Sequence, residues 1–229
     1  MKFKSQIFTA VSGSVGGLTF AKNKGGLYTR ARAIPTNPNT PSQVAARDAM
    51  STLVDAWTNT LAESARDAWR VYALNTPVVD VFGDPKLLTG QQMYIRSNQP
   101  RVRAGVPRVD PGPTIFNLGT FTTISIAISA AAPNDIIVTF TTSDAWANVD
   151  GGFLFIGASR QQNQSIAFFK APFRQAGTIF GDPVPPTSPK TIVSDFPYAL
   201  ANKAFVTARA GQADGRLSTA QIVSTVVVP

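Results

Sequence analysis

Hydrophobic and polar positions follow three different patterns along the chain. In residues 1–39, short apolar patches alternate with glycines, which predicts brief strands joined by glycine turns. In residues 40–109, apolar positions recur three and four apart, the spacing of one helix face. In residues 110–229, apolar and polar positions alternate over short runs, which indicates half-buried strands. The sequence therefore predicts an α+β protein with an extended arm, a small helical domain and an all-β domain.

The arm is predicted to form short strands at Ile7-Phe8, Leu18-Thr19-Phe20 and Leu27-Tyr28. Gly13–Gly17 is interpreted as a tight turn, because a phosphate-binding loop would also carry a Gly-Lys-Ser/Thr sequence. Alone, these patches bury too little apolar surface to order the segment. We therefore expect a neighbouring subunit to hold the arm, with strand addition to a neighbouring sheet as one mode.

Three capping boxes predict where helices begin, at residues 40–43, 60–63 and 89–92. The apolar face of the first helix is predicted to contain Ala46, Met50, Leu53 and Trp57. The face of the second is predicted to contain Leu61, Ala65, Ala68 and Tyr72, with Trp69 beside them. The third helix is expected to end near residue 98, before a proline. At this helical spacing the aromatic residues are expected to form a small core rather than a ligand pocket.

The strands of the third region are separated by turn signals rich in Gly, Pro, Asn and Asp. The strand candidates are residues 123–129, 136–140, 153–156, 166–169, 203–208 and 221–228. Residues 205–208 and 222–227 are predicted to form a hairpin across residues 211–215. About seven short strands with regular turns are typical of a β-sandwich. The proline-rich stretch 107–113 is interpreted as the boundary before it.

Composition leaves few residues for catalysis. The chain has no Cys and no His, and Glu63 is its one glutamate. Disulfides, thiolate chemistry and the commonest general base are thereby excluded. Glu63 has a structural task available at a helix start, which weakens its case as a catalyst. We expect no enzymatic activity, no metal and no cofactor.

Four aspartates lie at turn signals, Asp144, Asp150, Asp182 and Asp214. Aspartate favours turns because its side chain bonds to nearby backbone amides. Paired carboxylates of a glycoside hydrolase remain an open alternative, because their separation is not fixed by the sequence. Residues 160–164 are interpreted as a polar loop, with an exposed recognition loop as the alternative.

The net charge of +8 is concentrated in the first half. Residues 1–109 contain 14 Lys and Arg against 6 acidic residues, whereas residues 110–229 contain 7 of each. This asymmetry indicates an acidic partner, which can be nucleic acid, a membrane surface or an acidic protein face. We assign partner binding to the basic arm and to the arginines after the third helix: Lys2, Lys4, Lys22, Lys24, Tyr28, Arg30, Arg32, Arg101, Arg103 and Arg108.

The helix pair at residues 40–75 has a net charge of −1, which does not suit a helix pair that lies on DNA. Contact with acidic protein surface is therefore favoured, and weak nucleic-acid contact stays an alternative. No apolar run approaches the roughly 18 residues of a membrane helix. The apolar stretch at residues 7–11 is too short for a signal-peptide core, so we expect an unexported protein of cytoplasmic origin.

Short motifs in the first half carry a resemblance to a known group of proteins. They lie at Gly13–Gly17, Tyr28–Arg32, Pro35–Thr40, Gln43, Arg47, Trp57, Arg66–Trp69 and Leu88–Asn98. In these residues the chain resembles small structural proteins encoded by tailed bacteriophages and prophages. The strand pattern of the second half resembles immunoglobulin-like or fibronectin type III modules, without the Cys…Trp…Cys signature of antibody domains.

The resemblance implies a virion component. We expect a non-enzymatic structural protein, decorating or associated with the head, that forms a closed symmetric homo-oligomer and contacts other virion proteins. Its location would be the virion, after synthesis in the host cytoplasm. The alternatives are a tail structural component, a DNA-binding or packaging-associated protein, and a carbohydrate-binding or carbohydrate-hydrolysing module.

Overall fold

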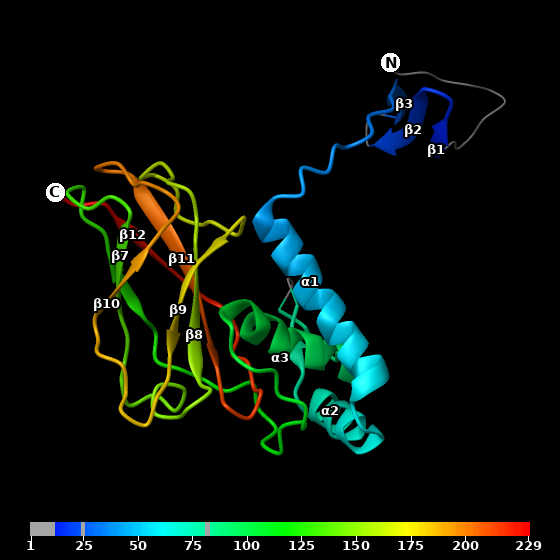
Figure 1. The fold of residues 1–229 in the computed structure, drawn as a ribbon. Helices are drawn as coiled ribbons and strands as arrows, with labels where there is room; N and C mark the ends of the chain where they lie inside the picture. Colours follow the sequence, from blue (N-terminus) through cyan, green and yellow to red (C-terminus); the bar gives the residue numbers. More distant parts are fainter. Residues whose placement is uncertain (1–11, 24–25, 81–82) are drawn as a thin grey trace. The chain divides into compact units, whose positions relative to one another are not determined.

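The computed structural model describes residues 12–23, 26–80 and 83–229. The chain divides into two compact units, Met1–Pro41 and Ser42–Pro229. Helices and several antiparallel sheets occur together, which confirms the α+β prediction (Figure 1). The strand predicted at residues 7–8 lies outside the described residues.

The first unit contains a three-stranded antiparallel sheet in the order β1-β2-β3. Its strands are β1 (Gly13–Val15), β2 (Leu18–Asn23) and β3 (Gly26–Ala31). The turn between β1 and β2 uses Gly16 at φ +57°, a conformation that favours glycine. The expected glycine turn is therefore confirmed at residues 16–17, whereas residues 13–15 form a strand.

The second unit begins with helices: α1 (Pro41–Asp55), the π-helical turn η1 (Ala56–Thr60), α2 (Glu63–Asn75) and α3 (Gly90–Ala104). The short strands β4 (Val78–Val79) and β5 (Pro85–Lys86) form a hairpin before α3. The predicted start of α1 is confirmed. Its predicted face is confirmed at Leu53, which is fully buried, and wrong at Met50, which is 44% exposed, because α1 buries Ala49 instead.

The capping box predicted at residues 60–63 is also wrong. The π-helical turn extends the first helix through Thr60, so α2 begins at Glu63, and Ala62 caps it without a side-chain bond. Arg66 binds the end of that turn, where its Nε donates to the carbonyl oxygen of Trp57 at 2.8 Å. Arg66 thus satisfies carbonyl oxygens at the end of the π-helical turn, whereas no side chain caps the start of α2.

The capping box of α3 is confirmed. Thr89 Oγ1 accepts a hydrogen bond from the Gln92 amide at 3.2 Å, and Gln92 Oε1 accepts one from the Thr89 amide at 3.0 Å. The end predicted before Pro100 is wrong, because α3 continues to Ala104 and stops at Gly105, which has a left-handed φ of +78°. Pro100 is buried, so packing offsets the backbone bond that a proline forfeits.

The strands of the second unit form two antiparallel sheets. One has the order β10-β7-β6 and the other β12-β11-β8-β9. The strands are β6 (Ser125–Ala127), β7 (Asp135–Thr139), β8 (Phe153–Ala158), β9 (Arg174–Phe180), β10 (Lys190–Val193), β11 (Lys203–Gly211) and β12 (Gln221–Val226). Ile136 of β7, Ile156 of β8 and Val206 of β11 belong to one buried cluster, so the two sheets share a core.

Most predicted strands are confirmed, including the β11–β12 hairpin, in which Phe205 pairs with Ser224. Residues 166–169 are not a strand, because this loop packs by side chains: the Phe169 ring stacks on Phe205 with centroids 5.5 Å apart. Strands β9 and β10 were not predicted. Gly177 interrupts the apolar pattern of β9, and a Cβ there would lie 2.8 Å from an Ile192 methyl group, so only glycine fits beside β10.

The helices and the two sheets belong to the same compact unit. The Trp69 indole N–H donates to the carbonyl oxygen of Asp110 at 2.9 Å, which ties the proline-rich stretch to α2. Arg96 of α3 donates to the carbonyl oxygens of Leu217 and Ser218 at 2.9 and 3.2 Å, at the start of the β12 side of the hairpin. Residues 107–113 therefore form a packed connection rather than a loose linker.

The expected aromatic core of the helices is confirmed. Trp69, Tyr72 and Tyr94 are fully buried, and Trp69 makes edge-to-face contacts with both tyrosine rings, with centroids 5.8 and 5.5 Å away. Tyr72 donates from its hydroxyl to the carbonyl oxygen of Asn117 at 2.7 Å. Burial raises the pKa of Tyr72 to about 12, so the hydroxyl stays protonated and the bond persists at neutral pH.

Candidate partner-binding surface

The sheet of the arm has one apolar face. The register pairs Leu18 with Val15 and with Ala31, and it pairs Phe20 with Thr29 and Lys22 with Leu27. Cross-strand partners lie on the same face of an antiparallel sheet. We call the face that contains Val15, Leu18, Phe20, Leu27 and Ala31 the apolar arm face.

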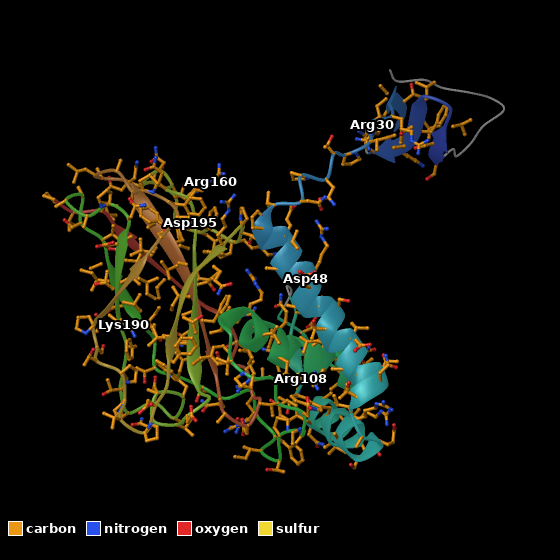
Figure 2. All side chains as sticks on the ribbon, viewed as in Figure 1. Arg30, Asp48, Arg108, Arg160, Lys190 and Asp195 are labelled. Atoms are coloured by element: carbon orange, nitrogen blue, oxygen red, sulfur yellow. The ribbon has the colours of Figure 1, made fainter. Side chains whose placement is uncertain are left out.

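The opposite face of the arm is polar. It contains Ser14, Thr19, Tyr28 and Arg30, and the Ser14 and Thr19 hydroxyl groups are 2.8 Å apart. Arg30 is exposed on the arm and is labelled in Figure 2. The arm residues assigned to partner binding thus divide between two faces: Tyr28 and Arg30 on the polar one, Lys22 on the apolar one.

The remaining arm residues assigned to partner binding are Arg32, Lys2, Lys4 and Lys24. Arg32 follows β3, is exposed, and donates from its backbone amide to the Gly17 carbonyl oxygen at 2.8 Å. Lys2, Lys4 and Lys24 lie outside the described residues.

No described residue of the arm sheet is buried. Val15 is 74% exposed and Leu18 is 48% exposed, although both lie on the apolar arm face. Ordering each residue costs about 1–2 kcal/mol of backbone entropy, and a sheet without a buried core gains little free energy from apolar burial to offset that cost. The described arm residues therefore form a sheet whose apolar face is available to be covered by another surface.

Arg101, Arg103 and Arg108, the other arginines assigned to partner binding, occupy three different environments. Arg101 is only 3% exposed, and its guanidinium donates to the carbonyl oxygens of Pro107 and Gln212 at 2.9 Å each. Burial lowers the pKa of Arg101. Arg101 therefore does not belong to a partner-binding surface, because its donors are used inside the fold.

Arg103 and Arg108 are partly exposed. The Arg103 guanidinium lies over the Phe155 ring, 5.8 Å from its centroid. The Arg108 Nε donates to Asp110 Oδ1 at 2.8 Å, and this bond raises the pKa of Arg108. Figure 2 labels Arg108 beside the helices. Arg103 makes no ion pair with a described acidic side chain, in contrast to Arg108, which is paired with Asp110.

This difference leads to a prediction on stability. Arg101→Ala is expected to lower the free energy of unfolding by about 3 kcal/mol, because it leaves the buried Gln212 carbonyl oxygen and the partly buried Pro107 carbonyl oxygen without donors and opens a cavity. Arg103→Ala, the matched control two residues away, is expected to cost less than about 1 kcal/mol. Urea denaturation followed by circular dichroism measures both; equal losses would contradict the assigned environments.

Four of the acidic residues considered as chemical candidates, Glu63, Asp144, Asp182 and Asp214, make contacts that stabilise the fold. Glu63 forms ion pairs with Arg66 and Arg70, and the hydrogen bond from Arg70 is the main cause that lowers the pKa of its carboxyl. Asp182 Oδ1 accepts the Val184 amide at 2.9 Å, a turn bond of the kind expected for aspartate. Within the described ranges, no three acidic side chains gather into a group that could hold a metal ion.

Comparison with protein-family models and with curated proteins finds no match for this chain. The described helices also lack the length and apolarity needed to span a membrane.

Two features of the surface were not found from the sequence. The apolar arm face extends over three strands, and its signal was the alternation of Leu18 and Phe20 with the polar positions between them. Arg96 of α3 and Arg209 of β11 were not considered, although Arg209 alternates with buried Ala208 and Ala210 and must point out of the shared core.

Proposed function

We propose that this chain is a non-enzymatic structural protein of a bacteriophage virion, in a head-decoration or head-associated position. The arm anchors it to a neighbouring subunit, and the second unit covers or contacts other copies. The chain acts as a homo-oligomer that also binds other virion proteins. The sequence motifs quoted above support the phage assignment.

One observation carries the anchoring role: the apolar arm face lies on a sheet in which no described residue is buried. Full burial of a Leu or Phe side chain is worth about 1.5–3 kcal/mol. A protein surface that covers Leu18, Phe20 and Leu27 therefore supplies the free energy that the isolated sheet lacks. The open edges of β1 and β3 offer backbone groups for strand addition as well.

We also propose that the two sheets of the second unit form an immunoglobulin-like module. In seven-stranded modules of this kind the first, second, fourth and fifth strands oppose the third, sixth and seventh. Here β6, β7 and β10 share one sheet, and β8, β9, β11 and β12 share the other, so six strands follow that division and the fourth strand, β9, lies beside β8 instead. Projecting β modules of this kind suit a protein that covers a shell.

A DNA-binding role receives less support. Arg101 is buried and Arg108 is paired with Asp110, so the basic set does not form one continuous surface. Nucleic-acid binding relies on free cations along the phosphate backbone. The acidic side chains described above also give no particular support to a glycan-hydrolysing role.

Gradient sedimentation of a lysate that produces the phage tests the proposal. The chain is expected to sediment with tailed particles and to appear in their protein composition by mass spectrometry in many copies per particle. Recovery only in the slow-sedimenting fraction would contradict it. Retention of the slow fraction on duplex DNA, with steep loss on added salt, would instead favour the packaging alternative.

A further inference from the structure

The outer face of the β12-β11-β8-β9 sheet, which points away from the shared core, is covered at two places. The end of α3 and the residues after it cover one end, where Ala104 and Val106 pack with Phe153 and Leu217. The loop 163–173 covers the other, where Phe169 stacks on Phe205. Between them lies a cavity of about 280 Å³, which we call the basic groove.

Three cations line the basic groove: Arg103 from α3, Lys170 from the loop and Arg209 from β11. None of the described residues that line it is acidic. The side chain of Arg209 makes no hydrogen bond or ion pair with any described residue. Its charge therefore faces a cavity that supplies no counter-charge.

A second arginine strengthens this field. Arg96 lines the adjoining cavity, which shares Gln99 and Arg209 with the basic groove. Burial lowers the pKa of Arg96 to about 10, and the nearby positive charge of Arg209 adds to the shift. Burial also lowers the pKa of Arg209. Arg96 donates to the carbonyl oxygens of Leu217 and Ser218, whereas Arg209 has no such acceptor, so an anion in the groove would offset the charge of Arg209.

The groove also has apolar lining, which distinguishes protein from nucleic acid as its partner. Phe155 and Ile222 line it together with the cations. The Phe155 ring already lies under the Arg103 guanidinium, and Phe173 meets the edge of Phe169 with centroids 5.3 Å apart. Bases bind single-stranded nucleic-acid sites by stacking on free aromatic faces, and one face of Phe155 already carries the Arg103 guanidinium.

We propose that the basic groove binds an acidic segment of a partner protein. A carboxylate of the segment pairs with Arg209, others pair with Arg103 and Lys170, and apolar atoms of the segment lie on Phe155 and Ile222. Guanidinium groups form strong charge-assisted bonds with carboxylates. The inference does not rest on the proposed function, since the groove belongs to the second unit and the anchoring sheet to the first.

Fluorescence anisotropy with a labelled eight-residue peptide of alternating Glu and Ala tests this on the full chain. Arg209→Gln is expected to weaken binding about tenfold, the effect of losing one charge-assisted hydrogen bond. Arg160→Gln removes the same charge elsewhere and is expected to change peptide binding less than about twofold. Arg160 lies well away from α3 in Figure 2.

Thermal unfolding without peptide separates binding from folding. Arg209→Gln is expected to keep or raise Tm, because it removes repulsion with Arg96. A lowered Tm would assign Arg209 a structural role and overturn the proposal. Absence of peptide binding, equal losses in the Arg209 and Arg160 variants, or tighter and Arg209-dependent binding of a labelled 12-base-pair duplex would overturn it too.

Discussion

A chain that begins at Thr40 is expected to fold in its second unit but to be lost from purified particles. The truncation removes the apolar arm face, and covering Leu18, Phe20 and Leu27 is worth at least about 4 kcal/mol, or roughly a thousandfold in association constant. The arm is a separate compact unit, so the two sheets and their shared core remain. Quantitative mass spectrometry measures how many copies of the chain each purified particle contains, in separate preparations with the full-length chain and with the truncated chain.

Point substitutions control for the removal of a whole segment. Leu18→Asp places a charge on the apolar arm face, whereas Ala21→Asp places the same charge on the polar face of the same strand. Leu18→Asp is expected to act like the truncation, and Ala21→Asp to incorporate normally. Normal incorporation of the truncated chain, or equal loss for both aspartate variants, would contradict anchoring by this face.

Trp69→Ala is expected to lower the free energy of unfolding by about 4 kcal/mol. Trp69 is fully buried, contacts Tyr72 and Tyr94, and donates its indole N–H to Asp110. Its loss opens a cavity where α2, α3 and the connection to the sheets meet. Urea denaturation followed by far-ultraviolet circular dichroism measures the change.

Trp57→Ala is the matched control. Trp57 is partly exposed and packs at the margin of the same cluster, with its ring centroid 5.6 Å from that of Tyr94. We expect a loss below about 2 kcal/mol, in proportion to the smaller apolar area removed from water. If the two tryptophan variants were destabilised equally, Trp69 would not be the centre of the helical core.

Local sequence signals were sufficient to predict elements whose interacting residues lie close together in the sequence. The capping box at Thr89 lies within four residues, and the β11–β12 hairpin joins strands adjacent in sequence; both were predicted. The apolar alternation of residues 136–140 also identified buried Ile136 and Val138. These features depend on periodicity and turn chemistry, which a single sequence records.

Features that depend on distant contacts were not predicted. Met50 fits the spacing of the buried face that contains Leu53, yet Met50 is exposed and Ala49 is buried in its place. Arg101 and Arg103 look alike in the sequence, but α3 directs the first into the fold and the second toward the basic groove. The partner of Arg101 is more than a hundred residues away, at Gln212, and no local pattern indicates it.

Cryo-electron microscopy of the native particle tests the central claim most directly. The account predicts a shell, ring or tube in which residues 13–31 form an ordered sheet, with Leu18, Phe20 and Leu27 covered by a neighbouring subunit. It also predicts that this structure shows whether the position is in the head or the tail. A free monomer, or a particle in which the arm has no density, would contradict anchoring by the arm and make DNA or glycan binding the leading explanation.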